Sequence, residues 1–331
     1  MMVGEPDVQG SRAAAAQATT VGVAVITHAA REHLPHCLPR LLASPLRPRV
    51  LVVNSSSQDG TVELAAAMGA ETLTVDRCRF NHGLTRELAR RRLDTPVVAM
   101  LSPDAYPLHD DFLERLTEPV RSGRAEAAYG RQVAGTDSDR FEQALRAFNY
   151  PAASHVRSAA DRELHGSYSR FCSNACAAWS STALDAIGGF KPTLVSEETI
   201  AVTELLASGG RVAYVAEANV LHAHRLDLAG AFRRQFDIGY SRRLYDWLLL
   251  EGEGDGRRGR RFAQDLLRRV AREDAADLPR ILLQLASSWL GYRTGLHGHR
   301  LPLALARRLS GQDYFWSSEV MVAGGGALVA V

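Results

Sequence analysis

A lone carboxylate that follows a strongly apolar run is the residue best suited to chemistry in this chain. The run Val97–Leu101 is uninterrupted, which is typical of a strand covered on both faces. Pro103 cannot donate to a strand ladder and must end that strand, so Asp104 is predicted to lie at its C-terminal end. Open α/β sheets bind ligands at this edge, where a carboxylate can bind a divalent cation and the cation a diphosphate. The alternative is a helix cap, which neighbouring aspartates could provide equally well.

Two polar turns are predicted at the same edge of the sheet. Residues 54–61, Asn-Ser-Ser-Ser-Gln-Asp-Gly-Thr, follow a second buried strand and begin a helix. Their N–H groups and hydroxyls could bind a nucleotide or its ribose, and simple helix capping by Ser57 or Asp59 is compatible with that. Residues 80–86, Phe-Asn-His-Gly-Leu-Thr-Arg, make a similar turn, from which Arg86 could reach a base or a phosphate. No P-loop sequence is present, which removes the main support for a P-loop nucleotide site.

The elements that position these turns alternate along the first hundred residues. Apolar runs predict strands at 21–26, 50–53, 71–75 and 97–101, and helical periodicity predicts helices at 33–42, 61–68 and 84–93. This order predicts an α/β fold with a mostly parallel sheet and helices on both of its faces.

The pattern loosens after residue 104. Helices are predicted at 111–120, 141–148, 182–187 and 199–207, and strands at 127–133, 212–215 and 219–222. The polar stretch 151–170 is read as an irregular loop that contacts the acceptor. Helices at 232–250, 262–271, 278–290 and 303–309 follow, with a break at the Gly-rich residues 252–259. We therefore predict a disordered leader (1–20), an α/β domain (21–225), a C-terminal helical region (226–316) and a tail (317–331).

The composition is that of a soluble globular protein. Of the 331 residues, 46% are hydrophobic and 23% charged, and the net charge of +2 gives no general electrostatic case for nucleic acid. No apolar stretch approaches the roughly 18 residues that span a bilayer, and the N-terminus lacks the pattern of a signal peptide. The Cys172-x3-Cys176 pair has no matching metal-ligand pair, so free thiols and a cytoplasmic location are predicted.

The joint order of these motifs resembles family 2 glycosyltransferases of the GT-A fold, and among them the rhamnosyltransferase-like members. The resemblance covers about residues 21–316. Besides the turns and Asp104 it rests on motifs at 129–132 (Tyr-Gly-Arg-Gln), 148–151 (Phe-Asn-Tyr-Pro), 173–174 (Ser-Asn), 188–190 (Gly-Gly-Phe), 196–198 (Ser-Glu-Glu), 220–224 (Val-Leu-His-Ala-His) and 236–239 (Phe-Asp-Ile-Gly).

The resemblance implies a role for particular residues of this chain. The positions that would contact the nucleotide donor are Thr27, Asn54, Ser56, Asp59, His82, Arg86 and Asp104. Asp104 stands at the position of the metal-binding carboxylate, and His222 or His224 at that of a late histidine that meets the metal or diphosphate. Glu198 stands at the position of the catalytic base. For Glu198 the alternative is a carboxylate favoured by the helix dipole, and for the histidines a hydrogen-bonded pair without metal.

Two departures from the family pattern bear on this site. Ser102-Pro103-Asp104 stands where a fuller motif has Thr-Gln-Asp or two acidic residues, so the metal is expected to bind together with the donor. Ser196-Glu197-Glu198 stands where the family usually ends in aspartate, and glutamate is longer by one methylene group.

The function implied is inverting transfer of a sugar in cell-surface polysaccharide synthesis. The expected donor is dTDP-L-rhamnose, the cofactor Mg²⁺ or Mn²⁺, and the acceptor a glycan or lipid-linked oligosaccharide. A UDP-hexose or UDP-N-acetylhexosamine donor, or a non-catalytic nucleotide-sugar-binding subunit, remain alternatives. Arginines and tryptophans in the C-terminal helices suit a peripheral contact with the inner face of an anionic membrane, although a solvated helix face would have the same composition.

Overall fold

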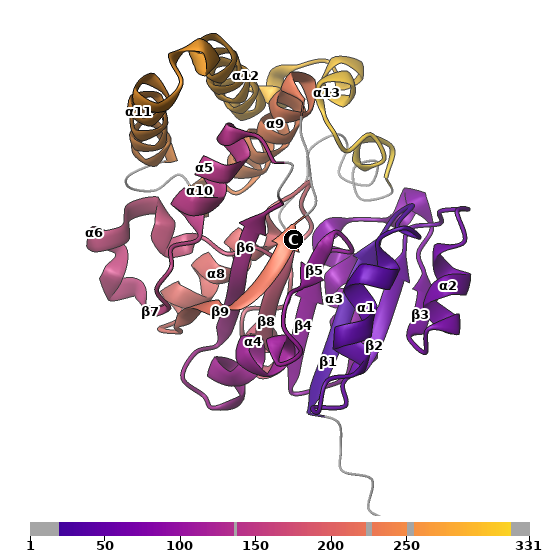
Figure 1. Cartoon of the computed structure of the whole chain (residues 1–331). Coiled ribbons are helices and arrows are strands. Elements are labelled where there is room, and N and C mark those ends of the chain that lie inside the picture. The colour runs from indigo at the N-terminus through magenta and orange to yellow at the C-terminus, as the bar shows by residue number, and fades with distance from the viewer. Residues whose placement is uncertain (1–19, 136–137, 223–226, 250–254, 319–331) are drawn as a thin grey trace, which may run out of the picture.

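The computed structural model describes residues 20–135, 138–222, 227–249 and 255–318. The chain forms an α/β fold in which one curled sheet is flanked by helices, with further helices gathered at one end (Figure 1). The sheet has nine strands and begins with four parallel ones in the order β3-β2-β1-β4. Their bounds are Val21–Thr27 (β1), Arg49–Asn54 (β2), Glu71–Thr74 (β3) and Val97–Leu101 (β4).

The three helices that connect these strands also lie where periodicity predicts them. They are α1 (Leu34–Leu42), α2 (Thr61–Ala67) and α3 (His82–Leu93). Every residue of β1 and β4 is buried, which agrees with their uninterrupted apolar sequences. The predicted α/β alternation is therefore confirmed, and the C-terminal ends of β1, β2 and β4 meet at one edge.

Beyond β4 the sheet is mixed. β8 (Cys176–Ser180) runs antiparallel to both β4 and β6 (Ala127–Ala134), and β9 (Val212–His222) runs parallel to β6. β5 (Ala105–Pro107) and β7 (His155–Arg157) pair antiparallel with β9. The two strands predicted at 212–215 and 219–222 are one strand, whose pairing with β6 shifts register between Gly130 and Arg131. A β-bulge thus replaces the predicted gap.

Three local predictions need correction. The stretch 151–170 is not irregular, because it contains β7, a short helix α6 (Arg162–His165) and two 3₁₀ turns. The predicted break at 252–259 overlaps α11 (Asp255–Glu273), which already begins at residue 255. The predicted helix 232–250 is divided at Tyr245, whose non-helical backbone separates α9 (Leu228–Leu244) from α10 (Asp246–Leu249).

The remaining helices surround the second half of the sheet and its end. They are α4 (Phe112–Arg121), α5 (Arg140–Asn149), α7 (Ser181–Ala186), α8 (Glu197–Ala207), α12 (Leu278–Leu296) and α13 (Leu303–Leu309). None of the helices in the described ranges combines the length and the apolarity needed to span a bilayer. The four cysteines are free, and only Cys78 is exposed.

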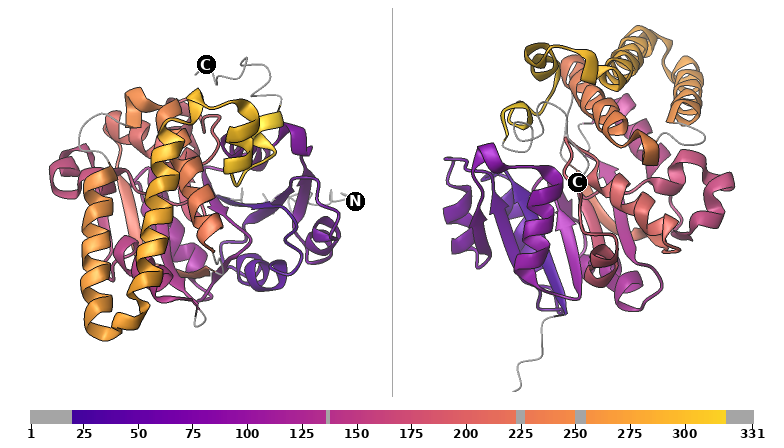
Figure 2. Two further views of the ribbon diagram at one scale, coloured as in Figure 1. Left: turned by 90° about the horizontal axis from the view of Figure 1, so that it is seen from above. Right: turned by 180° about the vertical axis from the view of Figure 1, so that it is seen from behind.

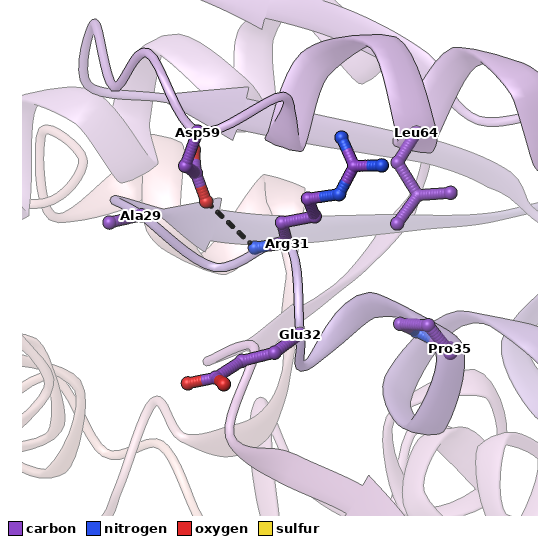
Figure 3. Close-up of a pocket in the computed structure, with 6 residues that line it drawn as sticks. All are labelled: Ala29, Arg31, Glu32, Pro35, Asp59 and Leu64. Atoms are coloured by element: carbon purple, nitrogen blue, oxygen red, sulfur yellow. Dashed lines mark hydrogen bonds between the residues drawn. The ribbon is translucent and has the colours of Figure 1, made fainter.

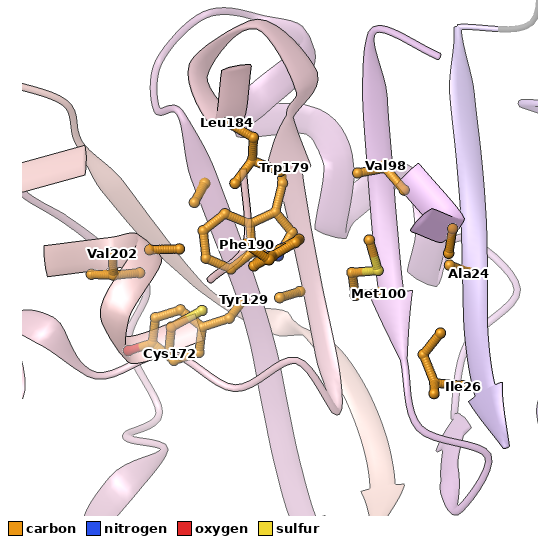
Figure 4. Close-up of a cluster of buried hydrophobic side chains, with 14 of the residues drawn as sticks. Ala24, Ile26, Val98, Met100, Tyr129, Cys172, Trp179, Leu184, Phe190 and Val202 are labelled. Atoms are coloured by element: carbon orange, nitrogen blue, oxygen red, sulfur yellow. The ribbon is translucent and has the colours of Figure 1, made fainter. Parts of the chain in front are cut away.

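The two faces of the sheet carry two apolar clusters. One cluster centres on Tyr129 and Trp179, with Phe190 packed edge-on against the Trp179 indole (Figure 4). The same cluster continues into the C-terminal helices through Phe236, Tyr240, Phe315 and Trp316. Side chains on both sides of the proposed boundary at residue 225 therefore share one core, and the division into domains stays a prediction. Most of the leader and most of the tail lie outside the described residues.

Candidate active site

Asp104 and His222 are brought together at the sheet edge by strand pairing. Asp104 lies in the short turn between β4 and β5, and Ala105 of β5 is paired directly with His222 of β9. The Asp104 Oδ1 and His222 Nε2 atoms are 3.7 Å apart, and both side chains are largely buried. His224, the other histidine proposed for the metal, lies outside the described residues.

Arg146 of α5 determines which nitrogen of His222 carries the proton. Its Nη2 donates a hydrogen bond to His222 Nδ1 at 2.7 Å, and its Nη1 donates to the side-chain oxygen of Gln132. Because a guanidinium can only donate, Nδ1 must be the acceptor and the neutral imidazole carries its hydrogen on Nε2. His222 therefore presents an N–H group, rather than a lone pair, towards Asp104.

The side chains at this edge that could bind a metal suit a weak site rather than one with a complete set of protein ligands. No group of three His, Cys, Asp or Glu side chains in the described part of the chain could hold a metal ion. Asp104 is a suitable oxygen ligand for Mg²⁺ or Mn²⁺. His222 can become a ligand through Nε2 only when Nδ1 carries the proton, which requires Arg146 to leave that atom. A cation here would depend on ligands supplied by a bound diphosphate.

The turn after β2 holds a strongly anionic carboxylate. Asp59 accepts hydrogen bonds from the Arg31 N–H at 3.0 Å, from the Ser57 hydroxyl at 2.7 Å and from the Thr61 hydroxyl at 2.7 Å. Burial alone would raise the pKa of the Asp59 carboxyl, but these hydrogen bonds outweigh it and hold the pKa well below its usual range. Asp59 is thus a fixed negative charge.

Asp59 also borders a hollow between the β1–α1 and β2–α2 loops. This hollow has a volume of about 520 Å³ and is lined by Ala29, Arg31, Glu32, Pro35, Asp59 and Leu64 (Figure 3). The Arg31 side chain runs between Asp59 and Leu64, while Glu32 points to the other side of the loop (Figure 3). The space could hold a nucleoside with a carboxylate and a guanidinium within hydrogen-bond reach.

The other polar residues of this turn are joined to one another. The buried Asn54 side-chain oxygen accepts a hydrogen bond from Thr27 Oγ1 at 3.3 Å and lies 2.8 Å from Ser57 Oγ. Ser56 has a positive φ of 54°, and its hydroxyl donates to the Val75 carbonyl at 2.9 Å. These contacts shape the loop, and direct contact of Thr27, Asn54 and Ser56 with a donor stays a prediction.

The Asn-His-Gly turn docks α3 against the segment before α8. Asn81 caps α3 by accepting from the N–H groups of Gly83 and Leu84, and its Nδ2 donates to the Thr193 carbonyl at 3.1 Å. Any side chain at Gly83 would collide with the Lys191 carbonyl oxygen, so this approach requires glycine. The start of α3 is thereby held beside the start of α8.

A buried polar chain then fixes Glu197. Arg86 Nη1 lies 2.9 Å from Glu197 Oε1, and both side chains are less than 10% exposed. Asn174 Nδ2 donates to the same oxygen at 2.9 Å, and the Trp179 indole N–H donates to Asn174 Oδ1 at 2.8 Å. Arg86 Nη1 also donates to His82 Nδ1, and burial together with the Arg86 charge lowers the pKa of His82 to about 4. Arg86 therefore binds Glu197, and His82 accepts a hydrogen bond from Arg86. Contact of Arg86 or His82 with a donor stays a prediction.

Glu198 directly follows this anchored carboxylate in the sequence. It lies partly buried in the first turn of α8, after Ser196 with a positive φ of 69°. Burial, and then the charge of Glu197, raise the pKa of Glu198 from 4.5 to about 8. A carboxyl group with that pKa suits proton transfer near neutral pH.

Arg234 of α9 connects the two ends of this site electrostatically. The pKa of the Arg234 guanidinium is lowered, because desolvation and the charge of Arg146 disfavour its charged form. The carboxylates of Glu198 and Asp104 act in the opposite direction. The guanidinium thus lies within electrostatic reach of both carboxylates. Sequence reasoning missed Arg146, Arg234, Glu197 and Asn174. Only the Ser173-Asn174 and Ser196-Glu197-Glu198 motifs offered a signal for any of them.

Comparison with known proteins gives consistent results. The model of the family described as glycosyl transferase family 2 matches residues 22–188. O-antigen chain rhamnosyltransferase RfbN of Salmonella typhimurium is 31% identical over 86% of this chain and 92% of that protein. O-antigen chain rhamnosyltransferase WbaN of Salmonella anatum is 28% identical over 82% of this chain and 86% of that protein.

Solved structures confirm the GT-A fold. S. aureus TarS 1–349 superposes with a TM-score of 0.53 at 13% identity and covers 92% of each chain. The mannosyltransferase PcManGT from Pyrobaculum calidifontis, in complex with GDP-Man and Mn²⁺, has a TM-score of 0.53 at 16% identity, over 91% of this chain and 86% of that one. Identities this low support a shared fold and nothing more specific.

Proposed function

Because the chain belongs to glycosyl transferase family 2, we propose that it moves L-rhamnose from dTDP-L-rhamnose to a glycan or lipid-linked oligosaccharide during synthesis of a cell-surface polysaccharide. The names of the two Salmonella relatives support this sugar and this pathway class. The observation that carries the catalytic part is the raised pKa of Glu198 beside an anchored Glu197.

The proposed reaction is a single in-line displacement with inversion. Glu198 accepts the proton of the acceptor hydroxyl while that oxygen forms a bond to the anomeric carbon. The bond between the anomeric carbon and the diphosphate oxygen breaks, and the nucleoside diphosphate leaves with the electron pair. The Glu197–Arg86 ion pair fixes the start of α8 and therefore the direction of the Glu198 side chain.

Negative charge on the leaving diphosphate requires cationic neighbours. Arg234, Arg146 and the Nε2–H group of His222 are the candidates on this chain. A Mg²⁺ or Mn²⁺ ion held by Asp104 would, when bound, add positive charge at the same place. We place the nucleoside in the hollow beside Asp59, with Thr27, Asn54 and Ser56 shaping the turn next to it.

Nucleoside diphosphate release from a panel of donors tests the proposal. We expect dTDP-L-rhamnose to be turned over faster than UDP-glucose, UDP-N-acetylglucosamine or GDP-mannose, and faster with Mg²⁺ or Mn²⁺ than with chelator. Preference for a UDP-sugar would replace the donor and keep the enzyme class. Saturable binding of a donor without release on any acceptor would instead favour a nucleotide-sugar-binding subunit.

The metal part of the proposal has its own test, because Arg146 holds His222 in the tautomer that cannot bind a metal through Nε2. Calorimetric titration of Mn²⁺ in the presence of dTDP should show tighter binding in Arg146→Met and weaker binding in Asp104→Asn than in the wild type. The same Mn²⁺ affinity in all three proteins would remove both residues from the metal site.

A further inference from the structure

The helix α12 carries large apolar side chains on its outward face. Leu282, Leu283, Trp289 and Leu290 are 51%, 59%, 63% and 52% exposed. Their spacing places them within about one third of the helix circumference, since residues seven apart nearly superimpose along a helix. In the view from above, α12 lies at the surface between α11 and α9 (Figure 2, left). We name these four residues the α12 apolar face.

The inward face of the same helix combines one large apolar residue with small and polar ones. Ile281, Gln284, Gly291 and Gly295 are buried. A side chain at Gly291 would collide with the Phe232 carbonyl of α9, and one at Gly295 with the Phe236 carbonyl. The backbones of α9 and α12 therefore touch, and α12 cannot rotate to bury its leucines without breaking this contact. The outward leucines and tryptophan are thus a fixed property of the fold.

A hollow of apolar and cationic character lies between α9 and α13 at the same end of the molecule. It has a volume of about 420 Å³ and is lined by Ala229, Phe232, Arg233, Leu305, Arg308 and Leu309. On the same two helices, Leu228, Leu303 and Leu305 are 43–53% exposed. Two guanidinium groups beside apolar side chains suit a phosphate attached to a hydrocarbon chain.

The charge of this end of the molecule favours an anionic partner. Residues 228–318 contain 16 arginines and ten acidic residues, although the whole chain has a net charge of only +2. The rest of the chain is therefore negative overall. A membrane that contains anionic lipids offers both an apolar interior for leucine and tryptophan and phosphates for arginine.

We propose that the α12 apolar face, with α13 and the start of α9, docks this protein on a bilayer that contains anionic lipids. Leu282, Leu283, Trp289 and Leu290 enter the interface, and Arg233 and Arg308 bind lipid phosphates. The C-terminal helices lie at the end of the sheet where β6 and β9 finish (Figure 1), so docking holds the site close to the membrane surface. The proposal deepens the proposed function, because a lipid-linked acceptor would be met there, but it does not depend on turnover.

Vesicle binding by the full chain tests the proposal. We expect sedimentation with vesicles of phosphatidylglycerol and phosphatidylcholine, and at least ten-fold weaker binding to phosphatidylcholine alone. The variant Leu282→Ser/Leu283→Ser/Leu290→Ser should lose binding at least ten-fold. Arg233→Gln/Arg308→Gln should lose the preference for phosphatidylglycerol. The matched control is Leu164→Ser, at a side chain that is 79% exposed on α6, and it should bind as the wild type does.

Tryptophan fluorescence shows which surface enters the lipid. Trp179 and Trp316 are buried, so quenching by lipids with brominated acyl chains reports on Trp247 and Trp289. Quenching should persist in Trp247→Phe and disappear in Trp289→Phe. Quenching that disappears only in Trp247→Phe would overturn the assignment to α12.

A second copy of the chain is the competing occupant of this face. A dimer in light scattering that becomes a monomer in the triple leucine variant, with no vesicle binding by the wild type, would overturn the membrane proposal. Donor turnover with a water-soluble acceptor in the absence of vesicles is measured separately. Failure of docking with intact turnover would leave the proposed function standing, and the reverse outcome would leave the docking surface standing.

Discussion

Asp59 and Glu198 lie at the same end of the fold and have opposite environments. Asp59, in the turn after β2, is surrounded by hydrogen-bond donors from Arg31, Ser57 and Thr61 that keep it ionised. At the start of α8, burial and the neighbouring charge of Glu197 raise the pKa of the Glu198 carboxyl to about 8. The comparison shows that one carboxylate is a permanent charge suited to binding, and the other is a group that can take up a proton.

The largest expected effect comes from removing the proton acceptor. Glu198→Gln keeps the shape of the side chain but cannot accept the proton, so turnover should fall by roughly 10²–10⁴-fold. In the wild type, kcat/KM should rise with pH through about 8 as Glu198 loses its proton, and this limb should be absent in Glu198→Gln. Product formation in single-turnover and pH-series assays measures both.

Glu198→Asp is the matched control, because it keeps a carboxylate and shortens its reach. Its turnover should lie between that of the wild type and that of Glu198→Gln, while calorimetric binding of dTDP should be unchanged in both variants. Wild-type turnover in Glu198→Gln would contradict the assignment and leave Glu198 as a helix-dipole carboxylate.

The next largest effect concerns the anchor beside Glu198. Arg86→Met removes the cation from the buried Glu197 carboxylate, and an unpaired buried charge typically costs about 3–5 kcal/mol. Urea unfolding should therefore show a loss of stability of that order at pH 7. In the double variant Arg86→Met/Glu197→Gln part of this stability should return, because the uncompensated charge is gone. A single variant as stable as the wild type would mean that the pair does not hold α8.

The two halves of the site also differ in how far the sequence could predict them. Apolar runs and helical periodicity located β1 to β4 and α1 to α3, because both signals are local. β8 was missed because Cys-Ala-Ala-Trp-Ser has no β-branched residue, and it is a strand only through pairing with β4 and β6. Non-local pairing is invisible to periodicity.

The same limit applies to the site. The positions of Asp104 and Glu198 at element ends follow from local pattern together with family resemblance. The contact of Arg146 with His222 joins a helix and a strand whose residues are 76 positions apart. No spacing pattern in the sequence predicts such a contact. Only the folded structure shows that Arg146 donates to His222 Nδ1. A histidine that binds a metal through Nε2 would carry its proton on that same Nδ1 atom.

A smaller effect is expected at the permanently charged carboxylate. Asp59→Asn loses an acceptor for charged hydrogen bonds, which are worth about 1.5–3 kcal/mol. The pKa of Asp59 is lowered by folding, so its stabilisation is present above the ordinary value of 3.8 and is lost as pH falls through the lower folded value. The difference in stability between wild type and variant should be largest at pH 7 and should shrink progressively as the pH falls from about 4 towards about 2. A constant difference across that range would point to shape rather than charge.

The smallest effect, with the opposite sign, is expected at Asp237 of α9. This carboxyl group is buried, and burial raises its pKa from 3.8 to about 7 against hydrogen bonds from Ser310 Oγ and the Gly311 N–H. A raised folded pKa means that stability is fully present below 3.8 and is lost as pH rises through about 7. Asp237→Asn removes the buried charge, which should increase stability at high pH. The asparagine must, however, turn its amide nitrogen towards either the Ser310 hydroxyl or the Gly311 N–H, so the lost hydrogen bond offsets part of that increase.

At pH 8.5 we therefore expect the free energy of unfolding of Asp237→Asn to exceed that of the wild type by about 1 kcal/mol, so that the variant melts at a higher temperature. At pH 5 the variant should not melt at a higher temperature than the wild type. Thermal unfolding of both proteins in a pH series measures the difference. A variant that is less stable than the wild type by the same amount at both pH values would show that the hydrogen bonds of Asp237 outweigh its charge. In that case Asp237 would resemble Asp59, and the contrast would be confined to α8.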